Sequence, residues 1–151
     1  MKDSDFKMLS HCVGEFCIAS RGNEVSDGYK PDLTVTDQRG ALQFIIECEQ
    51  KTDRKAFLGD LLKAERYAEE CKSNPTLVIV MQQADNTKVQ QIARQIQSYA
   101  HWLHRRGSDG LYISRIVVMS DTEYVQSVQD GEILGTQNFL DRGEVIDIPW
   151  S

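Results

Sequence analysis

Two carboxylates and a lysine occupy every second position at the end of an apolar segment. Glu47, Glu49 and Lys51 follow the run 44–46 (Phe-Ile-Ile). Alternate residues of a β-strand project from the same face, so these three charged groups are expected to share one face. Like charges on a buried strand are costly unless a cation or another partner compensates them. The pattern therefore predicts a cation site, although a solvent-exposed face of an edge strand would show the same spacing.

A third carboxylate stands where a neighbouring strand begins. Pro31-Asp32 follows a polar loop, and the sequence predicts two strands, 33–36 and 42–51, joined by a short turn. An antiparallel hairpin would bring Asp32 beside the Glu49 end of the second strand. Carboxylate oxygens are ligands for Mg²⁺ or Mn²⁺ rather than for Zn²⁺. The four cysteines form no CxxC pair of the kind that zinc sites use.

Pro31-Asp32, followed after 16 residues by Glu49-Gln50-Lys51, resembles the signature of the PD-(D/E)XK nuclease superfamily. The resemblance covers roughly residues 5–82. It implies that Asp32 and Glu49 are metal ligands, that the backbone carbonyl of Gln50 is a further ligand, and that Lys51 orients or activates the attacking water. A metal held by carboxylates lowers the pKa of its bound water and binds a phosphate oxygen. A nearby lysine stabilises the charge that develops in the transition state.

Two further acids are candidates by the same resemblance. Many members of the superfamily add an acid from the first helix, and Glu15 is the candidate here, with a solvent-exposed helix acid as the alternative interpretation. Some members carry ExE in place of ExK, so Glu47 is a second candidate metal ligand. The chain offers both motifs, one ending at Glu49 and one at Lys51, and the second is preferred because it retains the lysine. On the following predicted helix, Lys63 is more typical of a surface lysine than of a site residue.

The function implied by the resemblance is a Mg²⁺-dependent endonuclease that hydrolyses DNA phosphodiester bonds, with Mn²⁺ as an alternative metal. Such enzymes often act as homodimers, which address two strands with two sites. The alternative from another class is a non-catalytic nuclease-like fold that acts as a protein-binding or regulatory module. The acidic balance of the chain favours this alternative, whereas the near-complete ligand set favours the enzyme.

The spacing of apolar residues predicts the elements that must position these groups. The length of 151 residues predicts one domain over 1–151. The resemblance implies that 5–82 is its nuclease-like core and that 83–151 is a C-terminal elaboration. The pattern predicts helices over 5–19, 53–71, 88–105 and 121–129, and strands over 33–36, 42–51, 76–81, 112–119 and 145–148. This order describes an α/β fold with a mixed central sheet and helices on both faces. The resemblance implies that the core is restriction endonuclease-like.

The chain has a negative net charge that is unevenly distributed along the sequence. A total of 17 basic and 23 acidic residues gives a net charge of −6, which argues against a passive DNA coat but not against an enzyme that holds metal ions between carboxylates. Segment 76–110 has four basic and two acidic residues (+2), whereas 111–151 has two basic and seven acidic residues (−5). The basic and aromatic cluster 101–106 could contact a nucleic-acid backbone or stack on a base. A basic helix end that complements the helix dipole is the preferred interpretation of that cluster.

The sequence also bears on membranes and targeting. No apolar run approaches the roughly 20 residues that cross a bilayer. Residues 1–5 are polar and contain no signal-peptide core. These features predict a cytoplasmic protein without a membrane partner.

Overall fold

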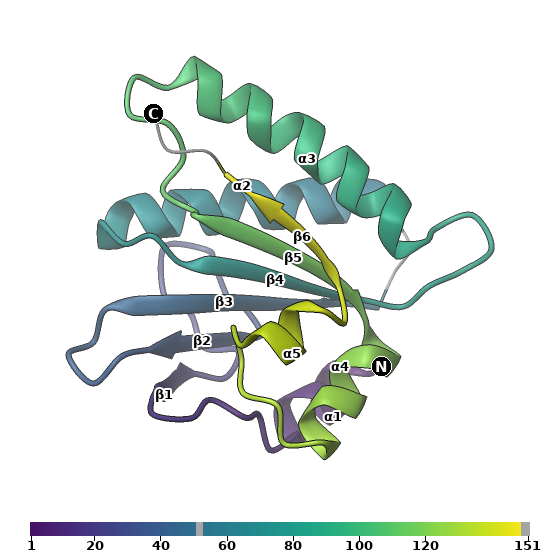
Figure 1. The fold of residues 1–151 in the computed structure, drawn as a ribbon. Coiled ribbons are helices and arrows are strands. Elements are labelled where there is room, and N and C mark those ends of the chain that lie inside the picture. The colour runs from purple at the N-terminus through teal and green to yellow at the C-terminus, as the bar shows by residue number, and fades with distance from the viewer. Residues whose placement is uncertain (51–52, 149–151) are drawn as a thin grey trace.

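The computed structural model describes residues 1–50 and 53–148. Its elements are shown in Figure 1. In chain order they are α1 (Asp3–Met8), β1 (Cys17–Ser20), β2 (Leu33–Thr36), β3 (Leu42–Glu49), α2 (Arg54–Cys71), β4 (Thr76–Met81), α3 (Val89–Arg106), β5 (Arg115–Ser120), α4 (Asp121–Gln129), α5 (Gln137–Leu140) and β6 (Glu144–Asp147). The α/β class and the mixed central sheet expected from the sequence are confirmed.

The six strands form one sheet in the order β1-β2-β3-β4-β5-β6. Strands β1, β2 and β3 are antiparallel neighbours, β3, β4 and β5 run parallel, and β6 is antiparallel to β5. The parallel strands are joined through α2 and α3, because a tight turn cannot connect parallel strands. Their carboxyl ends meet at one edge, where Glu49 is aligned with Met81 and Met81 with Ser120. This edge is where open α/β sheets usually bind ligands.

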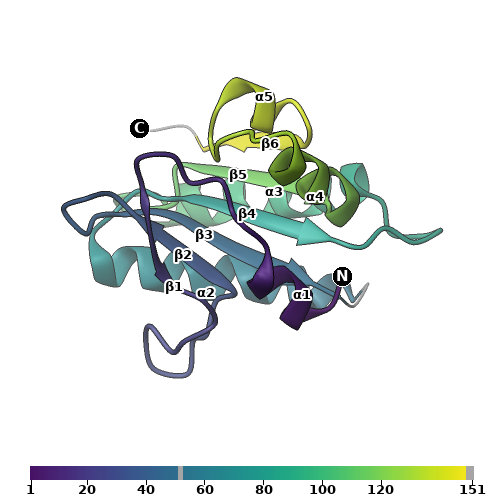
Figure 2. The same cartoon turned by 90° about the horizontal axis from the view of Figure 1, so that it is seen from below.

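Helices cover both faces of the sheet (Figures 1 and 2). On one face, α2 and α3 contribute Phe57 and Ile96 to a core cluster. On the other face, α1, α4 and α5 contribute Phe6, Tyr124 and Phe139 to a second cluster. Because both faces are covered, the central strand β4 is a continuous apolar run, as the sequence indicated.

The prediction of a helix over 5–19 is wrong. Helix α1 ends at Met8, and the chain then turns and forms the edge strand β1. Gly14 adopts a left-handed conformation (φ +60°) that a continuing helix does not contain. The helix-like spacing of Leu9, Val13 and Phe16 arises because all three pack against the same core cluster from a turning segment. Helix α5 was not predicted, and it is only four residues long.

Gly135 is expected to tolerate substitution less well than Gly131. Both have a positive φ (+82° and +70°), but a Cβ at Gly135 would lie 2.8 Å from Phe44 Cζ, whereas nothing lies within 4 Å of one at Gly131. Gly131→Ala should lower the free energy of unfolding by about 1–2 kcal/mol through backbone strain. Gly135→Ala should cost roughly 1–3 kcal/mol more, because it overpacks the core. Urea denaturation measures both losses, and equal losses would show that Phe44 moves aside freely.

Membrane insertion through a helix has no support in the part of the chain that the structure describes. None of its helices combines the length and the apolar character that crossing a bilayer requires.

Candidate active site

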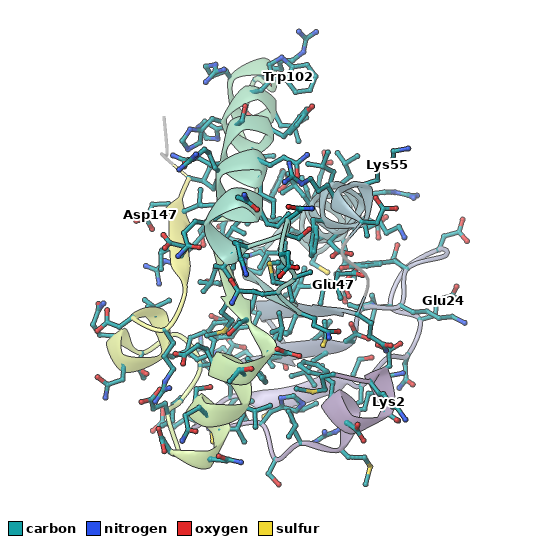
Figure 3. The ribbon with its side chains drawn as sticks, turned by 90° about the vertical axis from the view of Figure 1, so that its right-hand side faces the viewer. Lys2, Glu24, Glu47, Lys55, Trp102 and Asp147 are labelled. Carbon is teal, nitrogen blue, oxygen red and sulfur yellow. The ribbon has the colours of Figure 1, made fainter. Side chains whose placement is uncertain are left out.

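Strand β3 carries two glutamates to the edge where the parallel strands end. Ile45 packs beneath α2 and α3, whereas Phe44 and Cys48 pack on the opposite face. By strand alternation, Glu47 and Glu49 lie on the same side as Ile45. Glu47 is only 7% exposed although it is ionisable. Figure 3 looks at this end of the molecule and shows Glu47 near its centre.

Asp32 lies directly beside Glu47. The register of the β2–β3 hairpin pairs Leu33 with Ile46, so the residue before Leu33 faces the residue after Ile46. The backbone N–H of Asp32 donates a hydrogen bond to Glu47 Oε1 (3.2 Å). The backbone N–H of Cys48 donates one to Asp32 Oδ2 (2.8 Å). Both carboxylates are therefore held by the backbone of the strand opposite their own.

This register aligns Asp32 with one of the two motifs that the sequence offered. The motif that begins at Glu47 and ends at Glu49 stands opposite Asp32, whereas the preferred motif was the one that ends at Lys51. Glu49 and Gln50 line the same groove as Asp32, so both reach the site. Lys51 lies outside the described residues.

Glu15 does not join the group. It is exposed, and it lines a separate depression with Asp37 and Arg39 at the β2–β3 turn, at the end of β2 opposite to Asp32. The cause is the short α1, which leaves Glu15 in the turn before β1. The first helix instead contributes Asp3 to the groove that contains Asp32. Figures 1 and 2 both place α1 near the carboxyl end of β3.

Helix α2 adds a second buried carboxyl group, after that of Glu47. Its first turn is capped by Asp53, whose side chain accepts a hydrogen bond from the backbone N–H of Lys55. Asp60 follows on the face of α2 that is turned toward the sheet and is only 6% exposed. Its Oδ2 atom is buried and has no hydrogen-bond partner among the described residues. Such an oxygen is costly unless a proton or a cation compensates it.

Tyr29 completes the buried side of the site. Its hydroxyl group donates a hydrogen bond to Glu47 Oε2 (3.3 Å), and its ring packs edge-on against Tyr67 of α2, with 6.0 Å between the ring centroids. Tyr29 is held by a short bridge to Ser26 in the loop before β2. Burial and the charge of Glu47 raise the pKa of Tyr29, so the hydroxyl remains a hydrogen-bond donor at neutral pH.

Burial raises the pKa of three carboxyl groups in this cluster. Burial raises the pKa of Asp32 to about 6, although the hydrogen bond from Cys48 opposes the shift. Burial and then the charge of Asp32 raise the pKa of Glu47. Burial and then the charges of Glu47 and Glu49 raise the pKa of Asp60. Each shift has the same meaning: without a compensating positive charge, the folded protein disfavours the ionised form.

The cluster opens into a groove of about 540 Å³. The acidic residues that line the groove are Asp3, Asp32, Glu47, Glu49 and Asp60, and the basic ones are Lys30 and Lys63. The groove is thus strongly acidic on its floor, with two ammonium groups at its walls. The sequence favoured Lys63 as an ordinary surface lysine, and it is indeed exposed while also lining the groove.

Sequence reasoning missed Asp3, Tyr29 and Asp60. Asp60 carried a usable signal, because it is an acid in the apolar stripe that Phe57 and Ala64 define on the second helix. Asp3 and Tyr29 carried none, since one precedes the predicted helix and the other lies in a loop without periodicity.

The donor set fits a hard cation. Among residues 1–50 and 53–148, no three acidic, histidine or cysteine side chains stand close enough together to form a metal cage. Mg²⁺ needs no such cage, because it keeps several waters and binds through one or two carboxylates plus substrate phosphates. The adjacent carboxylates of Asp32 and Glu47 supply that number, and Asp60, whose buried Oδ2 has no hydrogen-bond partner among the described residues, lines the same groove.

Comparison with known proteins gives no further identification. No family model, no curated protein and no solved structure matches this chain.

Proposed function

We propose that the protein is a Mg²⁺-dependent nuclease that hydrolyses phosphodiester bonds of DNA. The observation that carries the proposal is the convergence of Asp32, Glu47, Glu49 and Asp60 in one groove at the carboxyl end of β3. Three of these carboxyl groups have a raised pKa, which is the condition that a divalent cation relieves. Mn²⁺, with the same preference for oxygen ligands, is the expected substitute.

The hairpin register supports Asp32 and Glu47 as the principal metal ligands, with Glu49 beside them. When bound there, Mg²⁺ would supply a water of lowered pKa and neutralise charge on the phosphoryl group. The protein's own residues prepare the ligands. The Cys48 N–H orients Asp32, and the Tyr29 hydroxyl orients Glu47.

Lys30 and Lys63 are assigned to the phosphate group of the substrate. Both line the acidic groove from its walls, and an ammonium group that reaches a phosphate oxygen offsets the charge that grows in the transition state. Lys51 keeps the role of a candidate that orients the attacking water, as the resemblance to the nuclease superfamily implies. The order of α1, the β2–β3 hairpin, α2 and β4 agrees with the order that this resemblance implies.

The non-catalytic alternative is favoured by the acidic balance of the chain, to which the C-terminal segment contributes most. Five of the seven acids in 111–148 form ion pairs. Asp121 pairs with the N-terminus, Asp147 pairs with Arg115, and Glu123, Asp130 and Glu132 pair with Arg142. Arg115 and Arg142 are already counted in the charge of −5, so these pairs leave the segment acidic, and only the N-terminus adds a positive charge from outside it. What favours the enzyme over a protein-binding fold is the convergence of carboxyl groups in the groove.

A nicking assay tests the proposed function. Supercoiled plasmid is incubated with Mg²⁺, Mn²⁺ or chelator, beside the isosteric variant Asp32→Asn. We expect metal-dependent nicking that the variant loses by roughly 10²–10³-fold, the effect typical of removing a group that stabilises transition-state charge. Glu15→Gln is the matched control and should cleave normally, because Glu15 lies outside the groove. Equal cleavage by all three proteins, or none in any metal, would count against the site.

A further inference from the structure

Helix α3 carries a stripe of arginine and aromatic side chains outside the groove. We call Arg94, Gln95, Tyr99, Trp102, Arg105 and Arg106 the α3 stripe. Gln95, Tyr99, Trp102 and Arg106 are spaced by three or four positions, which places them on one side of the helix, and Arg94 and Arg105 adjoin them. Tyr99 and Trp102 are both 47% exposed, which is unusual for such large aromatic groups. Figure 3 shows Trp102 at the outer tip of α3, while Glu47 lies at the centre of the same view.

The arginines of the stripe have no acidic partner in the part of the chain that the structure describes. Helix α3 contains no aspartate or glutamate. Within residues 1–50 and 53–148, neither Arg94, Arg105 nor Arg106 forms an ion pair. The helix is therefore positively charged, although the chain as a whole has a net charge of −6. Its free guanidinium groups are therefore available to anions from outside the chain.

The stripe adjoins a groove of about 500 Å³ that leads back to the start of α2. Arg54, the first residue of α2, lines this groove together with Arg94, Gln95 and Tyr99. The Oε1 atom of Gln95 is buried there without a hydrogen-bond partner in the described part of the chain. The Arg54 side chain donates a hydrogen bond to the backbone carbonyl of Asn86 (3.1 Å), which holds it between the start of α2 and the loop before α3.

The helix dipole does not account for this pattern. Basic residues in the last turn of α3, Arg105 and Arg106, complement the negative helix end. Arg94 lies in the first half of the helix, where that effect is absent. The dipole also gives no reason for the exposed aromatic rings of this helix. The ring centroid of Trp102 lies 5.2 Å from the guanidinium carbon of Arg106.

We propose that the α3 stripe binds single-stranded nucleic acid and holds the strand that leads into the carboxylate groove. The inference rests on the proposed nuclease function, which it deepens by naming a single strand as the substrate class. Cationic side chains along a groove with aromatic rings for stacking form the usual surface for single strands. A partner protein or a second copy would find charge here but little apolar surface besides the two rings.

Fluorescence anisotropy with a labelled single strand of roughly 16 nucleotides tests the proposal. The measurement uses full-length protein in chelator, so that binding is separated from cleavage. Trp102→Ala should weaken binding by roughly 5- to 100-fold, whereas Trp102→Phe should keep most of the affinity because it still stacks. Arg94→Ala should weaken binding. It should also make the slope of log K against log [salt] less steep by about 0.7. Arg39→Ala, in the β2–β3 turn, is the matched control and should change nothing.

The outcomes separate this inference from the nuclease proposal. Binding through the stripe without any cleavage in Mg²⁺ would support the stripe and refute the nuclease. Normal cleavage and binding by Trp102→Ala and Arg94→Ala would refute the stripe and leave the nuclease standing. Tighter binding of duplex than of single strand, unaffected by Trp102→Ala, would overturn the proposal. The proposal would also be overturned if Trp102→Ala or Arg94→Ala changed the oligomeric mass of the protein, measured by light scattering, but not its affinity for the single strand. That result would make α3 an interface between copies of the chain.

Discussion

Glu47→Gln is expected to lose metal-dependent cleavage by roughly 10²–10³-fold and, at the same time, to make the metal-free protein more stable. The loss of cleavage follows from the loss of a charged metal ligand. The gain in stability follows because, without a cation, the folded protein must either keep a proton on Glu47 or bury its charge beside Asp32, and both cost free energy that glutamine does not. Glutamine preserves the shape and can still accept the hydrogen bond from the Asp32 N–H.

Plasmid nicking and thermal unfolding in chelator measure the two effects. A gain of about 1–3 kcal/mol is expected from removing an uncompensated buried charge, which corresponds to a Tm increase of roughly 2–12 °C for a domain of this size. Glu144→Gln, on the exposed strand β6, should change neither property. If Glu47→Gln lost cleavage and stability together, Glu47 would be a structural residue rather than a ligand.

The metal-free protein is expected to lose stability as the pH rises from about 7 to about 8.5. Burial raises the pKa of Asp60 to about 11, so over this range the folded state keeps a proton on Asp60 that the unfolded state has already released. The pKa of Glu47 is raised to about 7, so Glu47 makes its contribution mainly below pH 7. Stability from such groups is fully present below their unfolded pKa and is lost as the pH rises through the folded one. Each group that remains protonated contributes a slope of about 1.4 kcal/mol per pH unit. His11, with its pKa lowered to about 4 by burial, acts in the opposite direction, but mainly below pH 6.5.

Mg²⁺ should reverse this loss, because it favours the ionised carboxylates that high pH produces. At ten times its Kd, the metal would add about 1.4 kcal/mol, or roughly 3–6 °C in Tm. Asp60→Asn should flatten the pH dependence of the metal-free protein, because it removes the retained proton. Chemical denaturation at each pH, with chelator or with Mg²⁺, provides the measurement. A wild-type stability that rises over this pH range in chelator would contradict the raised pKa values.

Most of the sheet could be predicted from the sequence, because its strands depend on short-range apolar patterns. β2, β4 and α4 have the predicted bounds, and β3 differs only at its carboxyl end. The first helix failed because apolar spacing alone cannot tell a helix from a turning segment that packs on the same core. The local sign against a helix was Gly14, because a glycine readily adopts the positive φ that it has here and that a helix does not contain.

The site was only partly predictable, for a different reason. A pattern of alternate charges indicates which residues share a face, but not which residue of the next strand stands opposite. The turn and a register irregularity between Val35 and Thr36 determine that pairing, and they bring Asp32 to Glu47. The apolar stripe of α2 indicates that Asp60 is buried, but which strand residues it meets depends on how α2 packs over β3, and no local pattern encodes that packing.

The two outer strands limit how copies of this chain can associate. Strand β1 has four residues and an irregular register between Ile18 and Ser20, and β6 also has four residues, two of them the acids Glu144 and Asp147. Edge strands that are short, bulged or charged discourage a neighbouring chain from adding a strand to the sheet. Continuous sheets across two molecules are therefore disfavoured, as is fibrillar stacking from these borders. A homodimer of this chain should therefore form through side chains of helices or loops, and not through hydrogen bonds between the edge strands of the two copies.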